Sequence, residues 1–169
     1  IKTAAQKVLE ASGEKVGLDI EVESSVPVGA GLGSSAAVAA AVATAVNHLV
    51  KANLSKEQIF RISYNAERLT HGTPSGIDPA ISTFGGILLF QKDTGFTPLD
   101  VKGEICIVVG DTGVERSTGD LVARVREKRE QYPSIIDPII RTGREIVMRA
   151  VEAIKKGDFH TLGELMNIN

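Results

Sequence analysis

Residues 27–37 read Pro27-Val28-Gly29-Ala30-Gly31-Leu32-Gly33-Ser34-Ser35-Ala36-Ala37. Three alternating glycines allow the backbone to curl and bring its N–H groups close to a ligand. The following residues, 35–50, are mostly small and apolar, which predicts a helix able to pack closely on its neighbours. Because a helix N-terminus offers amide donors and the positive end of a dipole, this stretch is suited to holding a polyphosphate without a basic side chain.

Two other glycine motifs do not fit this stretch. The dinucleotide-binding fingerprint requires glycine where Ser34 stands and an acidic residue after a following strand, but a helix is predicted at that distance. The P-loop requires Gly-Lys-Ser/Thr, and residues 27–37 contain no lysine. A tight turn that serves packing alone is the alternative. Pro27 before the glycines and the paired serines after them favour a phosphate cradle, with a serine hydroxyl placed for phosphate or magnesium.

The composition is that of a soluble globular protein with enough apolar residues for a core. The sequence has 169 residues, of which 43% are hydrophobic and 24% charged, and its net charge is −2. Such a charge creates no field that favours nucleic acid or an anionic membrane, and the apolar run 36–50 is too short to span a bilayer. Cys106 is the single cysteine, which rules out an internal disulfide and favours a reducing, cytoplasmic compartment. The oligomeric state is left open, a homodimer included.

Local patterns predict the elements around the glycine-rich stretch. Residues 4–9 predict a short helix that ends near Gly13, and residues 18–26 alternate as a half-buried strand. Ser55 and Gln58 form a capping box for a helix that runs to about Leu69. The predicted core face of that helix consists of Ile59, Ile62, Ala66 and Leu69.

The second half of the sequence predicts two strands and two long helices. Residues 86–90 are predicted as a strand, and residues 104–109 as a strand buried on both faces, with Cys106 as a small buried side chain. Residues 120–131 and 138–156 are predicted as helices, separated by a break at residues 132–134. A further helix is expected to start after Gly157.

Two carboxylates, Glu67 and Asp78, are candidates for chemistry. For Glu67, late in the capped helix, a solvated surface position is the usual alternative. Asp78 lies in residues 71–79, predicted as a loop stiffened by two prolines. It could cap a turn or helix, or accept the proton of an attacking hydroxyl. His71 could act as a base, but a structural role at the end of the helix is favoured.

Three segments carry a resemblance to a known family. Residues 27–37 resemble the second motif of the GHMP small-molecule kinases. Glu67 followed by His71-Gly72-Thr73-Pro74-Ser75-Gly76-Ile77-Asp78 resembles the Glu-x3-His-Gly-x-Pro-Ser-Gly-[Val/Ile]-Asp pattern of the mevalonate kinases within that superfamily. Residues 111–118 resemble the family's Asp-(Ser/Thr)-x-x-x-Arg-x-Thr loop, although Thr118 as a simple helix cap is equally compatible.

The resemblance implies an α+β fold of the GHMP kinase type. It implies a ribosomal protein S5 domain 2-like N-terminal, ATP-binding domain over residues 1–100. Residues 101–169 would begin a ferredoxin-like C-terminal domain, and both domains are expected to be incomplete in this sequence. The family's N-terminal lysine motif and its C-terminal glycine-rich motif are absent, and neither Lys2 nor Lys7 has a matching context. We therefore expect residues 1–169 on their own to have little or no kinase activity.

The resemblance also implies a reaction and a set of residues. The reaction is transfer of phosphate from ATP to the C5 hydroxyl of (R)-mevalonate, with Mg²⁺ as cofactor. Asp78 would be catalytic, Ser34 and Glu67 would bind the metal, and Ser75, Gly76 and Thr118 would lie on the substrate side. The residues implied to bind the ATP phosphates are Pro27, Gly29, Ala30, Gly31, Leu32, Gly33, Ser34 and Ser35. Other GHMP kinases, acting on phosphomevalonate, homoserine or a sugar, and a non-catalytic nucleotide-binding module are the alternatives.

Overall fold

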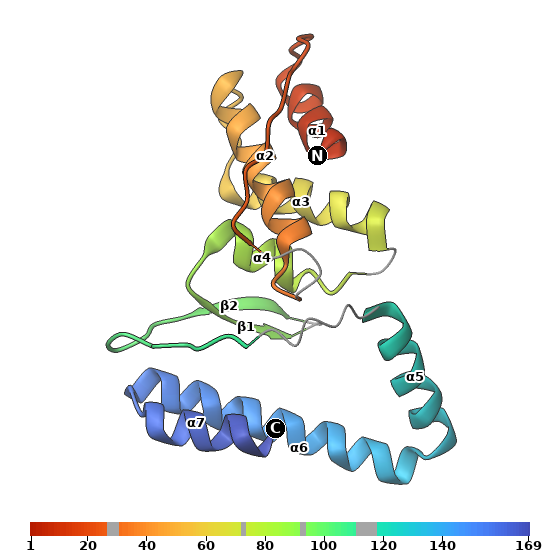
Figure 1. Ribbon diagram of the computed structural model, residues 1–169, viewed down its shortest axis with the longest axis vertical. Coiled ribbons are helices and arrows are strands. Elements are labelled where there is room, and N and C mark those ends of the chain that lie inside the picture. Colours follow the sequence, from red (N-terminus) through yellow and green to blue (C-terminus); the bar gives the residue numbers. More distant parts are fainter. Residues whose placement is uncertain (27–30, 72–73, 92–93, 111–117) are drawn as a thin grey trace. The chain divides into compact units, whose positions relative to one another are not determined.

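A computed structural model describes residues 1–26, 31–71, 74–91, 94–110 and 118–169 (Figure 1). The described part is α+β, with seven helices and one two-stranded sheet. It forms two compact units. One comprises Ile1–Gly86 with Phe90–Phe96, and the other comprises Ile87–Leu89 with Thr97–Asn169.

The first unit contains four helices whose ends are set by local sequence. They are α1 (Lys2–Ser12), α2 (Ser34–Leu49), α3 (Lys56–His71) and α4 (Ile77–Phe84). Helix α1 ends as predicted at Gly13, whose φ of 74° is readily adopted by glycine and whose N–H donates to the Leu9 carbonyl. The predicted capping box before α3 is also present: the Ser55 N–H donates to Gln58 Oε1 at 2.8 Å, and the Gln58 N–H donates to Ser55 Oγ at 3.3 Å.

The core of this unit lies between α1, α2 and α3. Its buried side chains are small or β-branched, which lets the helices approach closely: Ala4, Ala5, Val8, Ala39, Val42, Ala43, Val46, Ile59 and Ile62. Helices α2 and α3 pack against each other, and the turn between them is fixed where Asn47 Oδ1 accepts from the Leu54 N–H at 2.9 Å. Leu69 was predicted to face the core, but it is 75% exposed.

The strand predicted over residues 18–26 is not formed. This stretch runs beside α2 without a pairing strand in the described part of the chain (Figure 1). Ile20 and Val22 remain 37% and 42% exposed, and the stretch and α2 line an apolar groove of about 570 Å³. An alternating pattern reports which side chains share a face, but a strand also needs hydrogen bonds from a neighbour. The alternation alone was therefore insufficient.

A hairpin and three helices complete the described chain. Strands β1 (Ile87–Gln91) and β2 (Gly95–Leu99) pair with each other, so β1 was predicted to within a residue and β2 was missed. The remaining helices are α5 (Thr118–Gln131), α6 (Pro133–Lys156) and α7 (Phe159–Ile168). Helices α6 and α7 pack side by side, and the expected helix after Gly157 is confirmed: Asp158 Oδ1 caps α7 by accepting from the Thr161 N–H at 3.1 Å.

The buried strand predicted over residues 104–109 is also wrong. These residues belong to no strand, and Ile107, Val108 and Val109 are 69%, 96% and 63% exposed. Cys106, predicted to be buried, is exposed. An apolar run becomes a buried strand only when sheet partners and covering layers surround it, and the described residues supply neither. Among the helices described, none is long and apolar enough to cross a bilayer.

Candidate functional site

The glycine-rich stretch ends at the N-terminus of α2. Gly33 occupies the N-cap position with φ 66°, and no side chain of a described residue caps the helix there. The first-turn N–H groups therefore combine with the positive end of the helix dipole, as the phosphate-cradle prediction requires. Ser34 is half-buried, while Leu32 and Ser35 are exposed. Pro27, Gly29 and Ala30 lie outside the described residues.

Asp78 lies in the first turn of α4 rather than in the loop predicted for residues 71–79. The N-cap of α4 is Gly76, at φ 90°, so Asp78 is not the capping residue that one reading of the sequence suggested. Ser75 shapes the entry to the helix, because its Oγ accepts from the Ile77 N–H at 3.3 Å. The carboxylate of Asp78 is exposed at this end of α4 and is free to face a ligand.

The N-termini of α2 and α4 meet at Gly33 and Asp78. A methyl group built on Gly33 would lie 3.3 Å from Asp78 Cγ and 3.5 Å from its Oδ1. The glycine therefore lets the Asp78 carboxylate approach the backbone of the glycine-rich turn. Two positive helix ends and one carboxylate thus share a small volume, which is an arrangement suited to an anion next to a proton acceptor.

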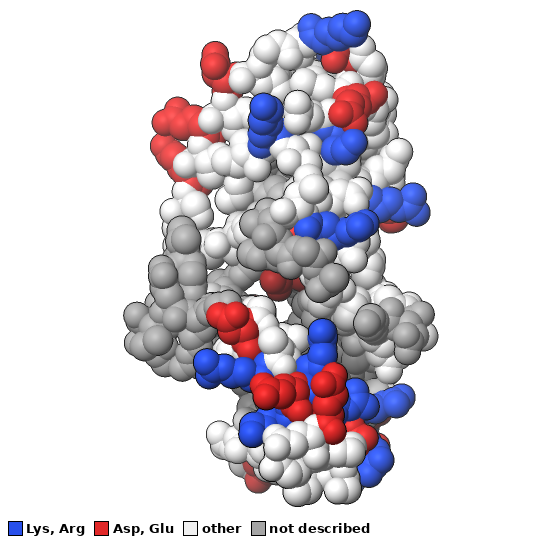
Figure 2. Space-filling view, turned by 90° about the vertical axis from the view of Figure 1, so that its right-hand side faces the viewer, with Lys and Arg blue, Asp and Glu red and all other residues white. Residues whose placement is uncertain are grey.

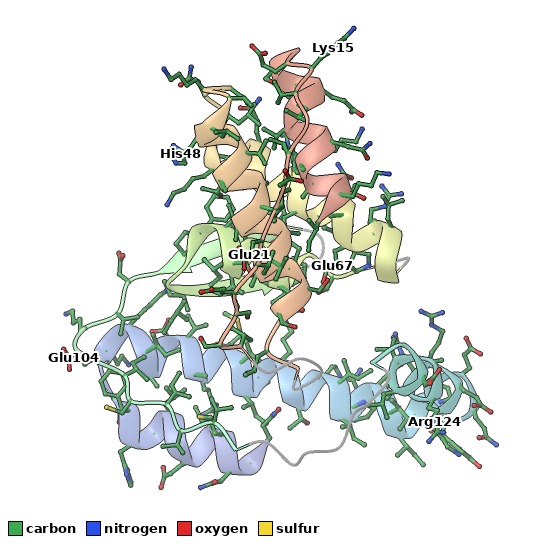
Figure 3. All side chains as sticks on the ribbon, turned by 45° about the horizontal axis from the view of Figure 1, so that its top comes forward. Lys15, Glu21, His48, Glu67, Glu104 and Arg124 are labelled. Atoms are coloured by element: carbon green, nitrogen blue, oxygen red, sulfur yellow. The ribbon has the colours of Figure 1, made fainter. Side chains whose placement is uncertain are left out.

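Glu67 approaches the same end of α2 from α3. Ser63, one turn earlier on α3, is fully buried and donates its hydroxyl hydrogen to the Ala36 carbonyl at 3.2 Å, which fixes α3 against the first turns of α2. Glu67 is 9% exposed, and Figure 3 shows it beside this end of α2. Glu67 is therefore not the solvated surface glutamate that the sequence left open as an alternative. Burial to this extent is unusual for a glutamate.

The oxygen donors at this site suit Mg²⁺ that arrives with a nucleotide. A serine hydroxyl and carboxylates are the hard ligands that Mg²⁺ prefers, and it commonly takes one or two carboxylates together with substrate phosphates. Within the described part of the chain, no group of three or more His, Cys, Asp or Glu residues could hold a metal ion by itself.

On the face shown in Figure 2, the surface charge offers no extended basic patch that could serve as an alternative anion site. Acidic and basic side chains are interspersed on the face shown in Figure 2, without an extended field of one sign. The apolar groove beside α2 carries Asp19, Glu21 and Glu23 and no basic residue, so it is unsuited to a phosphate. Among the described features, the helix N-termini are the better anion site.

Two predicted residues are placed only in part. Thr118 is the first residue of α5 and belongs to the second unit, while its side chain and residues 111–117 lie outside the description. His71 is the last residue of α3, the position predicted for a helix-closing histidine.

Sequence reasoning missed two features of α3, the buried Ser63 and the closeness of Tyr64 to Gly76. Ser63 lies one helical turn before Glu67, so that spacing could have revealed the shared face. Tyr64 packs against Gly76, a contact that no local pattern indicates.

The chain matches known kinases. Residues 1–86 match the family described as GHMP kinases N terminal domain. Mevalonate kinase of Pyrococcus horikoshii is 44% identical over 174 aligned positions, which cover 100% of this chain and 51% of that protein. Mevalonate kinase of Archaeoglobus fulgidus is 40% identical, covering 90% of this chain and 51% of that protein.

A solved structure is similar over nearly the whole chain. The crystal structure of L. major mevalonate kinase in complex with R-mevalonate aligns with a TM-score of 0.79 and 29% identity, covering 99% of this chain and 53% of that chain. The present chain thus spans about half the length of the relatives it matches.

Proposed function

This chain belongs to the GHMP kinase family, and we propose that the full-length protein phosphorylates the C5 hydroxyl of (R)-mevalonate with ATP in isoprenoid biosynthesis. The products are 5-phosphomevalonate and ADP, and the reaction takes place in the cytoplasm. The observation that carries the proposal is the contact between Gly33, at the start of α2, and Asp78, at the start of α4. The mevalonate kinase relatives support the choice of substrate.

The turn before α2 binds the phosphates of ATP. The N–H groups at the start of α2 and the positive helix dipole stabilise the negative charge of the triphosphate. Gly31, Leu32, Gly33, Ser34 and Ser35 supply this backbone, together with Pro27, Gly29 and Ala30 earlier in the same stretch. The Ser34 hydroxyl and the Glu67 carboxylate would hold Mg²⁺. When bound, this ion neutralises charge on the β- and γ-phosphates.

Asp78 receives the proton of the attacking hydroxyl. As the C5 oxygen bonds to the γ-phosphorus, Asp78 accepts its proton, and the bond between that phosphorus and the bridging oxygen of ADP breaks. Phosphoryl transfer depends mainly on positioning and charge stabilisation. The close approach of Asp78 to the phosphate-binding turn is consistent with this need. From the resemblance of their motifs to those of the family, we expect Ser75, Gly76 and Thr118 each to help to place mevalonate.

Replacement of Asp78 tests the mechanism. In the full-length protein, Asp78→Asn should lower kcat at least about 100-fold, because the proton acceptor is lost, while the Kd for ATP stays within about twofold. Turnover is measured by coupled ADP release, and ATP affinity by calorimetry. An Asp78→Asn enzyme with wild-type kcat would remove Asp78 from the mechanism.

A substrate panel tests the identity of the acceptor. The same assay with mevalonate, phosphomevalonate, homoserine and galactose should show turnover with mevalonate and little with the others. Turnover of homoserine or galactose without turnover of mevalonate would refute the proposed substrate and leave the family assignment intact.

A further inference from the structure

Gly76, the N-cap of α4, rests against the ring of Tyr64. Gly76 is buried, and a methyl group built on it would lie 3.3 Å from Cε2 and 3.4 Å from Cδ2 of that ring, with no other described atom within 4 Å. Its φ of 90° is a conformation that residues with a side chain rarely adopt. The ring edge of Tyr64 therefore lies next to the backbone at the start of α4, so close that a methyl group on Gly76 would crowd it.

Helix α4 contacts aromatic side chains of α3 at both of its ends. At the end opposite Gly76, the Phe84 ring lies 5.9 Å from the Phe60 ring of α3 and 4.8 Å from the Phe96 ring of β2, measured between centroids. Phe60 and Tyr64 are neighbours on α3, with ring centroids 6.2 Å apart. The two ends of this eight-residue helix are therefore flanked by different rings, with Tyr64 beside Gly76 and with Phe60 and Phe96 beside Phe84.

The ring of Tyr64 is linked to Asp78 through two residues of backbone. Gly76 contacts the ring, and Asp78, two residues later in the first turn of α4, lies against Gly33. Tyr64 also lies three residues before Glu67, so the two share one face of α3. This face of α3 therefore carries Glu67, the proposed metal ligand, and it reaches Asp78, the proposed proton acceptor, through the ring of Tyr64 beside Gly76.

We propose that Tyr64 is a positioning residue that sets the place of Asp78 relative to the phosphate-binding turn by packing its ring against Gly76. This role rests on the function proposed above for Asp78. The ring acts by its shape, not through its hydroxyl, and it affects the chemical step more than substrate binding. A displacement of about 1 Å at a reacting group can cost about 100-fold in rate, so a support of this kind bears directly on kcat.

Two substitutions of Tyr64 in the full-length protein separate shape from the hydroxyl. Tyr64→Leu removes the ring and should lower kcat about tenfold or more, while the KM values for ATP and mevalonate stay within about threefold. Tyr64→Phe keeps the ring and should retain kcat within about twofold. Wild-type kcat in Tyr64→Leu would overturn the proposal. So would a Tyr64→Phe enzyme as impaired as Tyr64→Leu, because the hydroxyl would then be responsible.

Phe96→Leu is the matched control for lost packing. It removes a ring from the same aromatic cluster, but Phe96 does not lie within 4 Å of the methyl position on Gly76. It should lower the melting temperature and leave kcat within about twofold of the wild type. An equal loss of kcat in Phe96→Leu and Tyr64→Leu would show a general packing effect and overturn the positioning role.

If Tyr64→Leu does not fold, Gly76→Ala tests the same contact from the other side. The added methyl group meets the Tyr64 ring and should lower kcat with little change in KM. Gly13→Ala is its control, since Gly13 has a similar φ of 74° with no described atom within 4 Å of the methyl position. Gly13→Ala should lose stability and keep kcat, whereas Gly76→Ala with unchanged kcat would overturn the proposal.

Asp78→Asn, measured beside these variants, separates the two proposals. If Asp78→Asn is inactive and Tyr64→Leu is fully active, the positioning role fails and the proposed function stands. If Asp78→Asn is active, the mechanism fails and the role of Tyr64 fails with it.

Discussion

Gly33→Ala should damage catalysis beyond its effect on stability. Gly33 has φ 66°, a left-handed conformation that costs alanine about 1 kcal/mol. Its new methyl group would also lie 3.3 Å from Asp78 Cγ, inside the separation of about 3.5–4.0 Å at which carbon atoms pack best. The first turn of α4 or of α2 must therefore move by a few tenths of an ångström, and it would carry Asp78 or the phosphate-binding amides with it.

The expected size of the two effects differs. The backbone cost of about 1 kcal/mol should lower the melting temperature of the full-length protein by about 2–4 °C. A displacement smaller than the 1 Å that can cost about 100-fold should lower kcat about tenfold, which corresponds to about 1.4 kcal/mol in the activation free energy. Coupled ADP release at saturating ATP and mevalonate measures kcat, and differential scanning fluorimetry measures the melting temperature.

Gly13→Ala again supplies the control. Gly13 ends α1 with φ 74°, and no described atom lies within 4 Å of its methyl position, so the substitution has the backbone cost without the contact. It should lower the melting temperature by a similar amount and leave kcat unchanged. The reasoning would be refuted if Gly33→Ala lost the same stability as Gly13→Ala and still turned over at the wild-type rate.

Two further predictions concern the metal and pH. Glu67→Gln keeps the size of the side chain but removes its charge, so it should raise the Mg²⁺ concentration needed for half-maximal turnover about tenfold or more; a magnesium titration equal to that of the wild type would exclude Glu67 as a ligand. At the start of α7, the hydrogen bond from the Thr161 N–H lowers the pKa of Asp158 from its ordinary value of 3.8, so the folded state binds this proton less readily than the unfolded state. The resulting stabilisation is present above pH 3.8 and is lost as pH falls through the lowered folded pKa. Urea unfolding between pH 6 and about pH 3 should therefore show a weaker acid dependence for Asp158→Asn than for the wild type.

Helices α1, α2 and α3 of the first unit could be predicted because their signals are local. The capping box of Ser55 and Gln58 marks the start of α3, and the C-cap glycine Gly13 marks the end of α1. The two failed strand predictions, over residues 18–26 and 104–109, have the opposite origin. Apolar patterns describe side chains only. A strand exists only where another segment supplies hydrogen bonds, and a local pattern does not show whether such a segment is present.

The candidate site shows the same division between local and distant information. Motif resemblance singled out Ser34, Glu67 and Asp78, and the structure brings the three helices that carry them together. The helical position of Asp78 could not be predicted, because Pro74 and Pro79 suggested a loop through this region. Pro79 is compatible with helix here because it lies in the first turn of α4, where no intrahelical N–H bond is required. The contact between Tyr64 and Gly76 depends on tertiary packing and has no local signal.

The structure thus gives a second explanation for glycine at these positions of the two motifs, in addition to the close approach of the backbone to a ligand. In the sequence alone, Gly33 was explained by the need of backbone N–H groups to come close to phosphate, and Gly76 was expected only to lie on the substrate side. In the structure, a side chain lies close to the position that a Cβ atom would occupy on each glycine. Asp78 lies there beside Gly33, and the Tyr64 ring lies there beside Gly76. Both adopt positive φ at the N-cap of a helix, so backbone conformation and contact independently favour glycine at the same positions. A substitution at either one would therefore change the distance between the phosphate-binding turn and the proton acceptor, and this distance is what the proposed reaction depends on.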